Sequence, residues 1–271
     1  MGGSMKHLAC TLWLLSALVP LCGCGGGRIT PTPSPQGLSI AGNWQFSTTS
    51  ESGMPPLGIA GSISQSGSGS SLSGAVHVSG SNCFDQPTTM SLTGTLTGSN
   101  ISLTSTPVAG QVIAFTGSVT NYGYAFTGTY TINGGCANGD QGNAAGIEIP
   151  ILDMWSGTFT ASGGETFNVD LSNVAQDSNP SPEGSFPITG TATFSTPCFN
   201  SGTLMSGTFP SGSFIIGTSV ALEIQTGNGV VSFLGTANPT TGQISGNYTV
   251  SGGTCDQTGT AVLLPNPWDY Y

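Results

Sequence analysis

Asp140 and Asp256 are the residues whose type and position could most directly support chemistry in this chain. Each follows the second cysteine of a repeated segment, Cys136 in one copy and Cys255 in the other. Two carboxylates about 5–9 Å apart can hydrolyse glycosides. Equivalent residues of two repeat copies, however, belong to separate units. A carboxylate-dependent hydrolase is therefore the least favoured function, and we predict no enzymatic activity and no cofactor.

The loop around Asp140 also offers oxygen ligands for a metal ion. Asn138, Asp140 and Asn143 place amide and carboxylate oxygens within six residues of each other. Oxygen ligands of this kind suit calcium. The same residue types also cap turns through their side chains. The loop is thus a calcium candidate, with local turn capping as the alternative.

Cysteine chemistry is the second possibility. Four of the seven cysteines fall in the repeated part of the chain, two in each copy. Exported proteins meet oxidising conditions, so disulfides are expected if the chain is exported. Four cysteines allow three connectivities, and the repeat favours Cys83–Cys136 with Cys198–Cys255. A four-cysteine zinc site is the alternative, but no CxxC spacing is present.

Aromatic side chains could stack on sugars or line a pocket. Trp44 and Trp155 open the two repeat copies, whereas Trp268 and Tyr270 follow the second copy. We consider all four as possible binding aromatics. Residues at alternating positions in strands are usually core residues, so Trp268 and Tyr270 are the ones expected to be exposed.

The charge pattern excludes several classes of partner. Lys6 and Arg28 are the only basic residues besides histidine, charged residues make up 5% of the chain, and the net charge is −10. Nucleic-acid binding needs several Lys and Arg side chains to neutralise phosphates. We therefore expect no nucleic-acid partner and no site that clamps phosphate or carboxylate with basic side chains.

The strongest signal is an internal repeat. Residues 115–132 align without gaps on residues 233–250, and Cys83-Phe84 matches Cys198-Phe199. We place one unit at 42–150 and a second at 151–271, which carries an insertion near Pro210 and ends in an aromatic tail. Apolar and polar residues alternate with a period of two, which predicts about eight short strands in each unit. The fold is expected to be all-β, with two tandem antiparallel up-and-down meanders that form closed or flattened barrels.

A five-residue pattern, apolar-x-Gly-x-apolar, recurs ten times in these strands. A glycine inside a strand lowers stability, so its repetition needs a physical reason. On the inner face of a tightly curved sheet, a missing side chain lets the strand coil sharply and lets an aromatic neighbour cover the gap. The ten glycines are Gly61, Gly74, Gly94, Gly117, Gly128, Gly157, Gly190, Gly207, Gly235 and Gly246.

The N-terminus reads as a targeting segment. Residues 1–23 contain a basic residue, Lys6, followed by the apolar stretch Leu8–Leu21, which is too short to span a bilayer as a mature helix. Residues 24–41 are rich in glycine and proline and form a tether between this segment and the first unit.

Leu21-Cys22-Gly23-Cys24 resembles the lipobox of bacterial lipoproteins. The resemblance implies that Cys24 is lipidated and anchors the protein to a membrane. The residue after it is Gly25 rather than aspartate, which in those proteins implies the outer membrane. Gly42-Asn43-Trp44 resembles the start of lipocalin-like and avidin-like barrels. A tryptophan that plugs one end of a barrel explains the same residues.

These observations predict a lipid-anchored protein of the bacterial cell envelope, without enzymatic activity, that is structural, adhesive or surface-protective. The alternative is a ligand-binding module that takes a small apolar molecule in a barrel mouth or a glycan on exposed aromatics. A cavity above about 300 Å³ lined by aromatic residues would favour ligand binding, and filled barrels would favour the structural role. The oligomeric state stays open.

Overall fold

The computed structural model describes residues 38–66, 70–81, 83–84, 88–120, 123–150, 154–238 and 241–265. The elements of this part of the chain are all β-strands. Within it, no helix is long and apolar enough to cross a membrane. Cys24, Trp268 and Tyr270 lie outside the described residues, as do the expected signal segment and most of the tether.

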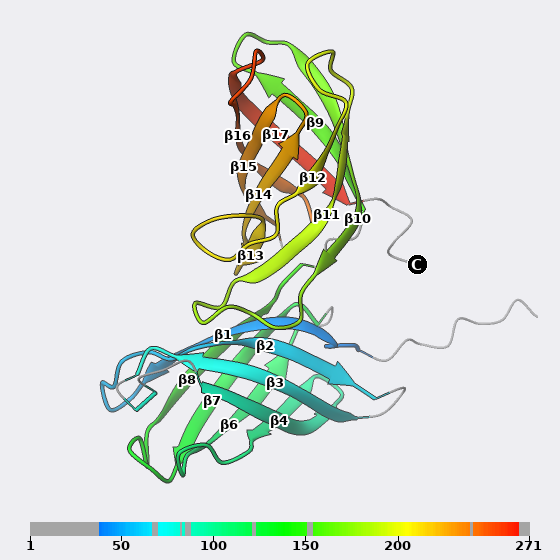
Figure 1. The fold of residues 1–271 in the computed structure, drawn as a ribbon. Coiled ribbons are helices and arrows are strands. Elements are labelled where there is room, and N and C mark those ends of the chain that lie inside the picture. The colour runs from blue at the N-terminus through cyan, green and yellow to red at the C-terminus, as the bar shows by residue number, and fades with distance from the viewer. Residues whose placement is uncertain are drawn as a thin grey trace, which may run out of the picture. The chain divides into compact units, whose positions relative to one another are not determined.

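Eight strands of the first unit form a closed antiparallel barrel in chain order (Figure 1). The last strand pairs with the first, from Trp44 opposite Glu148 to Ser50 opposite Gly142. The strands are β1 (Gly42–Ser50), β2 (Gly58–Gln65), β3 (Ser71–Ser79), β4 (Thr88–Thr97), β5 (Asn100–Ser105), β6 (Val112–Val119), β7 (Ala125–Asn133) and β8 (Gln141–Glu148).

The second unit repeats this plan with one strand position divided in two. β12 and β13 both lie between β11 and β14, and residues 205–213 separate them at the place of the predicted insertion. The sheet closes because β10 pairs with β11 and β17 pairs with β9. The strands are β9 (Trp155–Ala161), β10 (Thr166–Gln176), β11 (Phe186–Phe194), β12 (Ser201–Leu204), β13 (Phe214–Ile216), β14 (Ser219–Thr226), β15 (Gly229–Ala237), β16 (Ile244–Ser251) and β17 (Gln257–Pro265).

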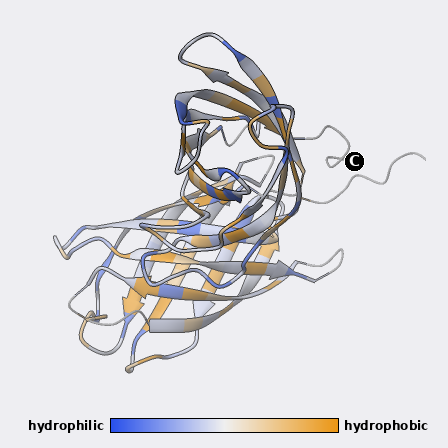
Figure 2. Cartoon of the chain, turned by 45° about the horizontal axis from the view of Figure 1, so that its top comes forward, coloured by the Kyte–Doolittle hydropathy of each residue, from blue (hydrophilic) through white to orange (hydrophobic). Residues whose placement is uncertain are grey.

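The predicted all-β fold is confirmed, and both sheets are closed barrels. Alternation explains why these segments form strands of one barrel. In β7, Phe126, Tyr130 and Ile132 are buried while Thr127, Thr129 and Thr131 between them are exposed. The same alternation of hydrophobic and polar residues runs along strands of both barrels (Figure 2). The inward side chains form the core, and Ser and Thr cover much of the outside without charge.

Aromatic rings fill the interior of each barrel. In the first, Phe46 stacks on Phe115 with ring centroids 5.4 Å apart and meets Phe126 edge-on at 5.8 Å. In the second, Phe159 contacts Tyr248, with centroids 4.7 Å apart. Offset and edge-to-face geometries of this kind add about 0.5–1.5 kcal/mol per pair beyond the apolar area they bury.

Glycines of the five-residue pattern stand where neighbouring strands approach closely. Gly117 and Gly128 lie directly opposite each other on β6 and β7. A Cβ atom on Gly128 would come within 2.6 Å of the Gly117 Cα atom and 2.7 Å of the Phe126 ring. Gly235 and Gly246 face each other in the same way on β15 and β16. The predicted arrangement of glycine beneath an aromatic ring is therefore present in both barrels.

We expect Gly128→Ala to destabilise the protein by about 1–3 kcal/mol, because the added methyl group would overlap backbone atoms that cannot rotate away. Gly163→Ala is the matched control, since its Cβ would meet no atom within 4 Å. That control should change stability by less than about 0.5 kcal/mol. Urea unfolding of the chain from Gly25 onward measures both values, and equal effects of the two substitutions would contradict the close-approach explanation.

Candidate functional site

A disulfide ties two loops at one end of each barrel. Cys83 in the β3–β4 loop bonds Cys136 in the β7–β8 loop, and Cys198 in the β11–β12 loop bonds Cys255 in the β16–β17 loop. Both predicted pairs are confirmed. In an up-and-down barrel these loops lie at the same end, which we call the disulfide end. Each bond closes a long loop of chain, which in the chain-entropy model stabilises by about 4 kcal/mol.

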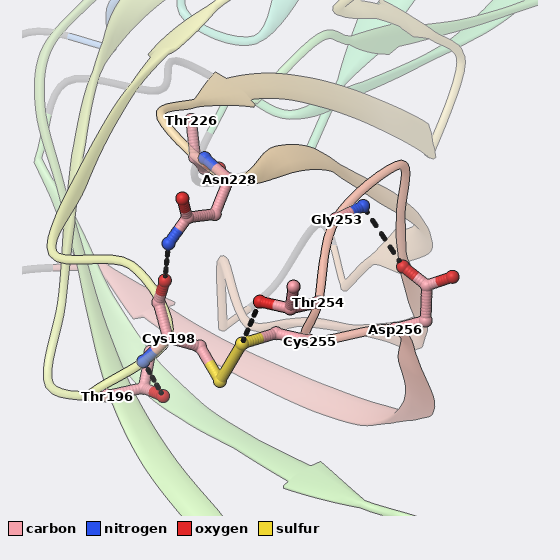
Figure 3. Close-up of a disulfide and its surroundings, with 8 residues drawn as sticks. All are labelled: Thr196, Cys198, Thr226, Asn228, Gly253, Thr254, Cys255 and Asp256. Atoms are coloured by element: carbon pink, nitrogen blue, oxygen red, sulfur yellow. Dashed lines mark hydrogen bonds between the residues drawn. A yellow bond between two sulfur atoms is a disulfide. The ribbon is translucent and has the colours of Figure 1, made fainter.

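An amide side chain supports the first cysteine of each disulfide. Gln111 is buried, donates from Nε2 to the Cys83 carbonyl at 3.2 Å, and accepts a hydrogen bond from the Ala137 backbone N–H. Gln111 therefore joins the two loops that the disulfide joins. Asn228 in the second barrel donates from Nδ2 to the Cys198 carbonyl (Figure 3). Sequence reasoning missed this pair because glutamine and asparagine in loops are common.

Asp140 holds the disulfide end of the first barrel together from the inside. Its carboxylate is buried and accepts hydrogen bonds from the hydroxyls of Tyr130 at 2.7 Å, Ser52 at 2.8 Å and Ser50. The β7 strand, the β7–β8 loop and the β1–β2 loop thus meet at one carboxylate. Three hydroxyl donors satisfy a buried charge that would otherwise be costly.

These hydrogen bonds also shift the pKa values of Asp140 and Tyr130. Burial by itself would raise the pKa of Asp140, but the hydrogen bonds from Ser50, Tyr130 and Ser52 outweigh it, so this pKa lies below its usual value. Burial, and then the bond to Asp140, raise the pKa of Tyr130. The pair is therefore a carboxylate and a neutral phenol near neutral pH.

The second barrel has an equivalent tyrosine, Tyr248, but not the hydrogen bond that Tyr130 makes to Asp140. Tyr248 occupies the position of Tyr130, with Phe233 opposite it as Phe115 is opposite Tyr130. Its hydroxyl oxygen is buried without a hydrogen-bond partner among the described residues, and burial raises its pKa. Asp256, the counterpart of Asp140, is exposed and accepts a hydrogen bond from the Gly253 backbone N–H at 3.3 Å (Figure 3).

Loop length explains this difference between the barrels. The β1–β2 and β7–β8 loops of the first barrel have seven residues each, 51–57 and 134–140. The β9–β10 and β16–β17 loops have four and five residues, 162–165 and 252–256. The shorter β16–β17 loop places Asp256 directly after Cys255, whereas Asp140 lies four residues after Cys136 and can turn inward.

A cavity lies at the disulfide end of the second barrel, beside these short loops. Its volume is about 480 Å³, within the range of small-molecule sites. Its walls combine an apolar part with polar groups of both neighbouring loops; the main lining residues are Glu165, Thr166, Phe167, Pro197, Cys198 and Gln257. Among the described residues, Glu165 is the only charged side chain that lines it.

The three residues considered as calcium ligands do not form a metal site in the structure. The calcium candidates do not converge: Asp140 is buried in its hydroxyl network, Asn138 accepts a hydrogen bond from the Gly134 N–H, and Asn143 is exposed on β8. The described residues contain no group of three or more His, Cys, Asp or Glu side chains that could hold a metal. Asn138 and Asp256 instead cap turns, because their side chains accept hydrogen bonds from backbone N–H groups of the same loops.

Trp44 and Trp155, considered above as possible binding aromatics, are core residues, as expected for alternating positions in strands. Their exposed fractions are 0% and 2%. The Trp44 indole N–H donates to the Ile40 carbonyl at 2.9 Å, and its ring stacks on Phe46. The residues that resemble a lipocalin-like start thus place a tryptophan that fills the barrel near the start of β1.

Glu148, at the end of β8, is the described carboxyl with the largest pKa change. Burial raises its pKa to about 7. Near neutral pH it is therefore partly protonated. A carboxyl with a pKa in this range can act as a general acid. Glu148 could not be singled out from the sequence, because the burial of a glutamate at the end of a strand is not visible there.

We expect Tyr130→Phe to lower the free energy of unfolding by about 1–3 kcal/mol, because it removes a donor from a buried carboxylate. Tyr248→Phe, the matched substitution in the second barrel, removes a hydroxyl that has no described partner and should be neutral or slightly stabilising. Urea unfolding measures both. A loss at Tyr248 as large as that at Tyr130 would show that the second hydroxyl has a partner in solution.

We expect stability to fall by up to about 3 kcal/mol as pH rises from about 4.5 to 7, because Glu148 holds its proton in the folded protein at pH values where the unfolded chain releases it. Glu148→Gln should remove this slope. The lowered pKa of Asp140 acts in a separate window, since its stabilisation is lost only as pH falls through its folded pKa, below about 4. Thermal unfolding between pH 3 and 8 checks both, and an unchanged slope in Glu148→Gln would contradict the assignment.

Comparisons with known proteins give the chain no family. No family model matches the chain, and no curated protein matches it. Among solved structures, the chain is similar to the crystal structure of "a putative AttH" from Nitrosomonas europaea, at 11% sequence identity and a TM-score of 0.22. The match covers 92% of this chain and 99% of that one.

Proposed function

We propose that this protein is a lipid-anchored structural protein of the bacterial cell envelope, adhesive or surface-protective, that acts without catalysing a reaction. The observation that carries the proposal is the filling of both barrels. Aromatic rings occupy their interiors, with centroids as close as 4.7 Å in the second barrel and 5.4 Å in the first. A barrel packed in this way serves as a rigid module rather than as a container.

The outer surface supports the same role. Its Ser and Thr residues interact with water without charge, and Lys and Arg do not occur after Arg28. A protease that cleaves after Lys or Arg therefore finds no site in either barrel. Two disulfides at loop positions add resistance where chains are usually cut first. These properties suit a module exposed to proteases outside the cytoplasm.

The Asp140 network supports a structural rather than a catalytic use of this buried carboxylate. Both oxygens accept hydrogen bonds from hydroxyls of the protein itself. The network lowers the pKa of Asp140, whereas a general acid or base usually has a pKa near the working pH. The carboxylate therefore holds loops in place.

The lipid anchor and the membrane as partner can be tested directly. In a bacterial host grown with an alkyne analogue of palmitate, the full chain should be labelled and recovered with the membranes. Cys24→Ala should be unlabelled, whereas Cys22→Ala should still be labelled because Gly23-Cys24 is kept. Gel fluorescence after membrane fractionation gives the readout. An unlabelled wild-type chain, or equal labelling of Cys24→Ala, would remove the anchor from the proposal.

A further inference from the structure

Shared neighbours connect the Tyr248 side chain to the cavity at the disulfide end of the second barrel. The Tyr248 ring covers Gly259, since a Cβ there would come within 2.7 Å of its Cε1 atom. Gly259 lies opposite Ala161, the last residue of β9. Gly164 and Glu165, three and four residues after Ala161 in the β9–β10 loop, line the cavity. The Tyr248 hydroxyl is thus expected beneath this cavity, just as the Tyr130 hydroxyl reaches Asp140, which accepts a hydrogen bond from Ser50 at the end of β1.

A second contact links the tyrosine to the cavity. Phe167 lines the cavity, and its ring stands edge-on to Tyr248, with centroids 5.8 Å apart. The Tyr248 side chain is 2% exposed. In the first barrel, the corresponding hydroxyl bonds Asp140. In the second barrel, with its shorter β16–β17 loop, the Tyr248 hydroxyl has no acceptor among the described residues, and a buried donor without an acceptor is costly.

We propose that this cavity binds a small neutral molecule with an aromatic or aliphatic body and a carbonyl or similar acceptor that takes a hydrogen bond from the Tyr248 hydroxyl. The apolar body lies against Phe167, Pro197 and the Cys198 side chain. Glu165 in the wall and the net charge of −10 disfavour an anionic ligand. Because the Tyr248 hydroxyl is buried, the proposal requires the β9–β10 loop, which contains Gly163 and Gly164, to move aside when the acceptor binds.

This site goes beyond the structural role and does not depend on it, because a rigid envelope module can carry a ligand at one end. The first barrel offers the internal comparison. Its disulfide end carries the same tyrosine, but Asp140 already accepts the hydrogen bond there. A ligand that needs the tyrosine hydroxyl should therefore bind the second barrel and not the first.

The test uses prodan, a neutral naphthyl ketone whose emission shifts to the blue in apolar surroundings, and the chain from Gly25 to Tyr271, which contains every strand of both barrels. Wild type should bind prodan saturably with a blue shift. Tyr248→Phe should weaken binding about three- to tenfold, the value of one neutral hydrogen bond. Tyr130→Phe, the matched control, should leave the affinity unchanged.

One further variant and one further probe distinguish binding at this cavity from nonspecific binding of the dye. Thr166→Trp changes an exposed lining residue and should abolish binding by filling the cavity. 2-Dimethylaminonaphthalene, which lacks the ketone, should bind wild type and Tyr248→Phe equally. The proposal is overturned if wild type shows no saturable binding, if Thr166→Trp binds as wild type does, or if Tyr248→Phe and Tyr130→Phe have the same effect. Near-ultraviolet circular dichroism confirms that each variant is folded.

Discussion

The close approach of neighbouring backbones at paired glycines is the constraint on which the rest of this structure depends. Where Gly117 faces Gly128 and Gly235 faces Gly246, no side chain separates the strands on the inner face. The strands can therefore coil tightly enough to close an eight-position barrel, and an aromatic ring fills the space left by the missing side chains. Curvature, closure and core packing thus have one common origin.

The two barrels share one fold but differ in the structure of their disulfide ends. Both barrels keep the disulfide, the amide that binds the first cysteine carbonyl, and a tyrosine near the end of the penultimate strand. The loops around that tyrosine differ in length. Long loops bring Asp140 and two serines to Tyr130, whereas short loops leave Tyr248 unpartnered beside a cavity. A few loop residues therefore determine whether a barrel end is closed by the chain itself.

Much of the fold was predictable because it rests on local patterns. Alternation predicts about eight strands in each unit, the glycine pattern predicts tight curvature, and the repeat selects the disulfide pairs among three possibilities. The polar contacts are harder to predict from the sequence. Asp140 is recognisable as a loop oxygen, but its partners Ser50, at the end of β1, and Ser52, in the β1–β2 loop, lie 90 and 88 residues away in the sequence. These contacts depend on how the barrel closes. The raised pKa of Glu148 and the cavity beside Phe167 likewise arise from packing that no short pattern encodes.

Closure of each barrel joins its first strand to its last, β1 to β8 and β9 to β17. Neither barrel can therefore be completed until its whole segment is available, and the pairing that completes it spans about a hundred residues, which slows folding. The two closures are separate, so the first barrel can close before the second is complete. A tandem of self-closing units exposes one set of open strand edges at a time, which limits the edge-to-edge association to which unfinished β-sheets are prone.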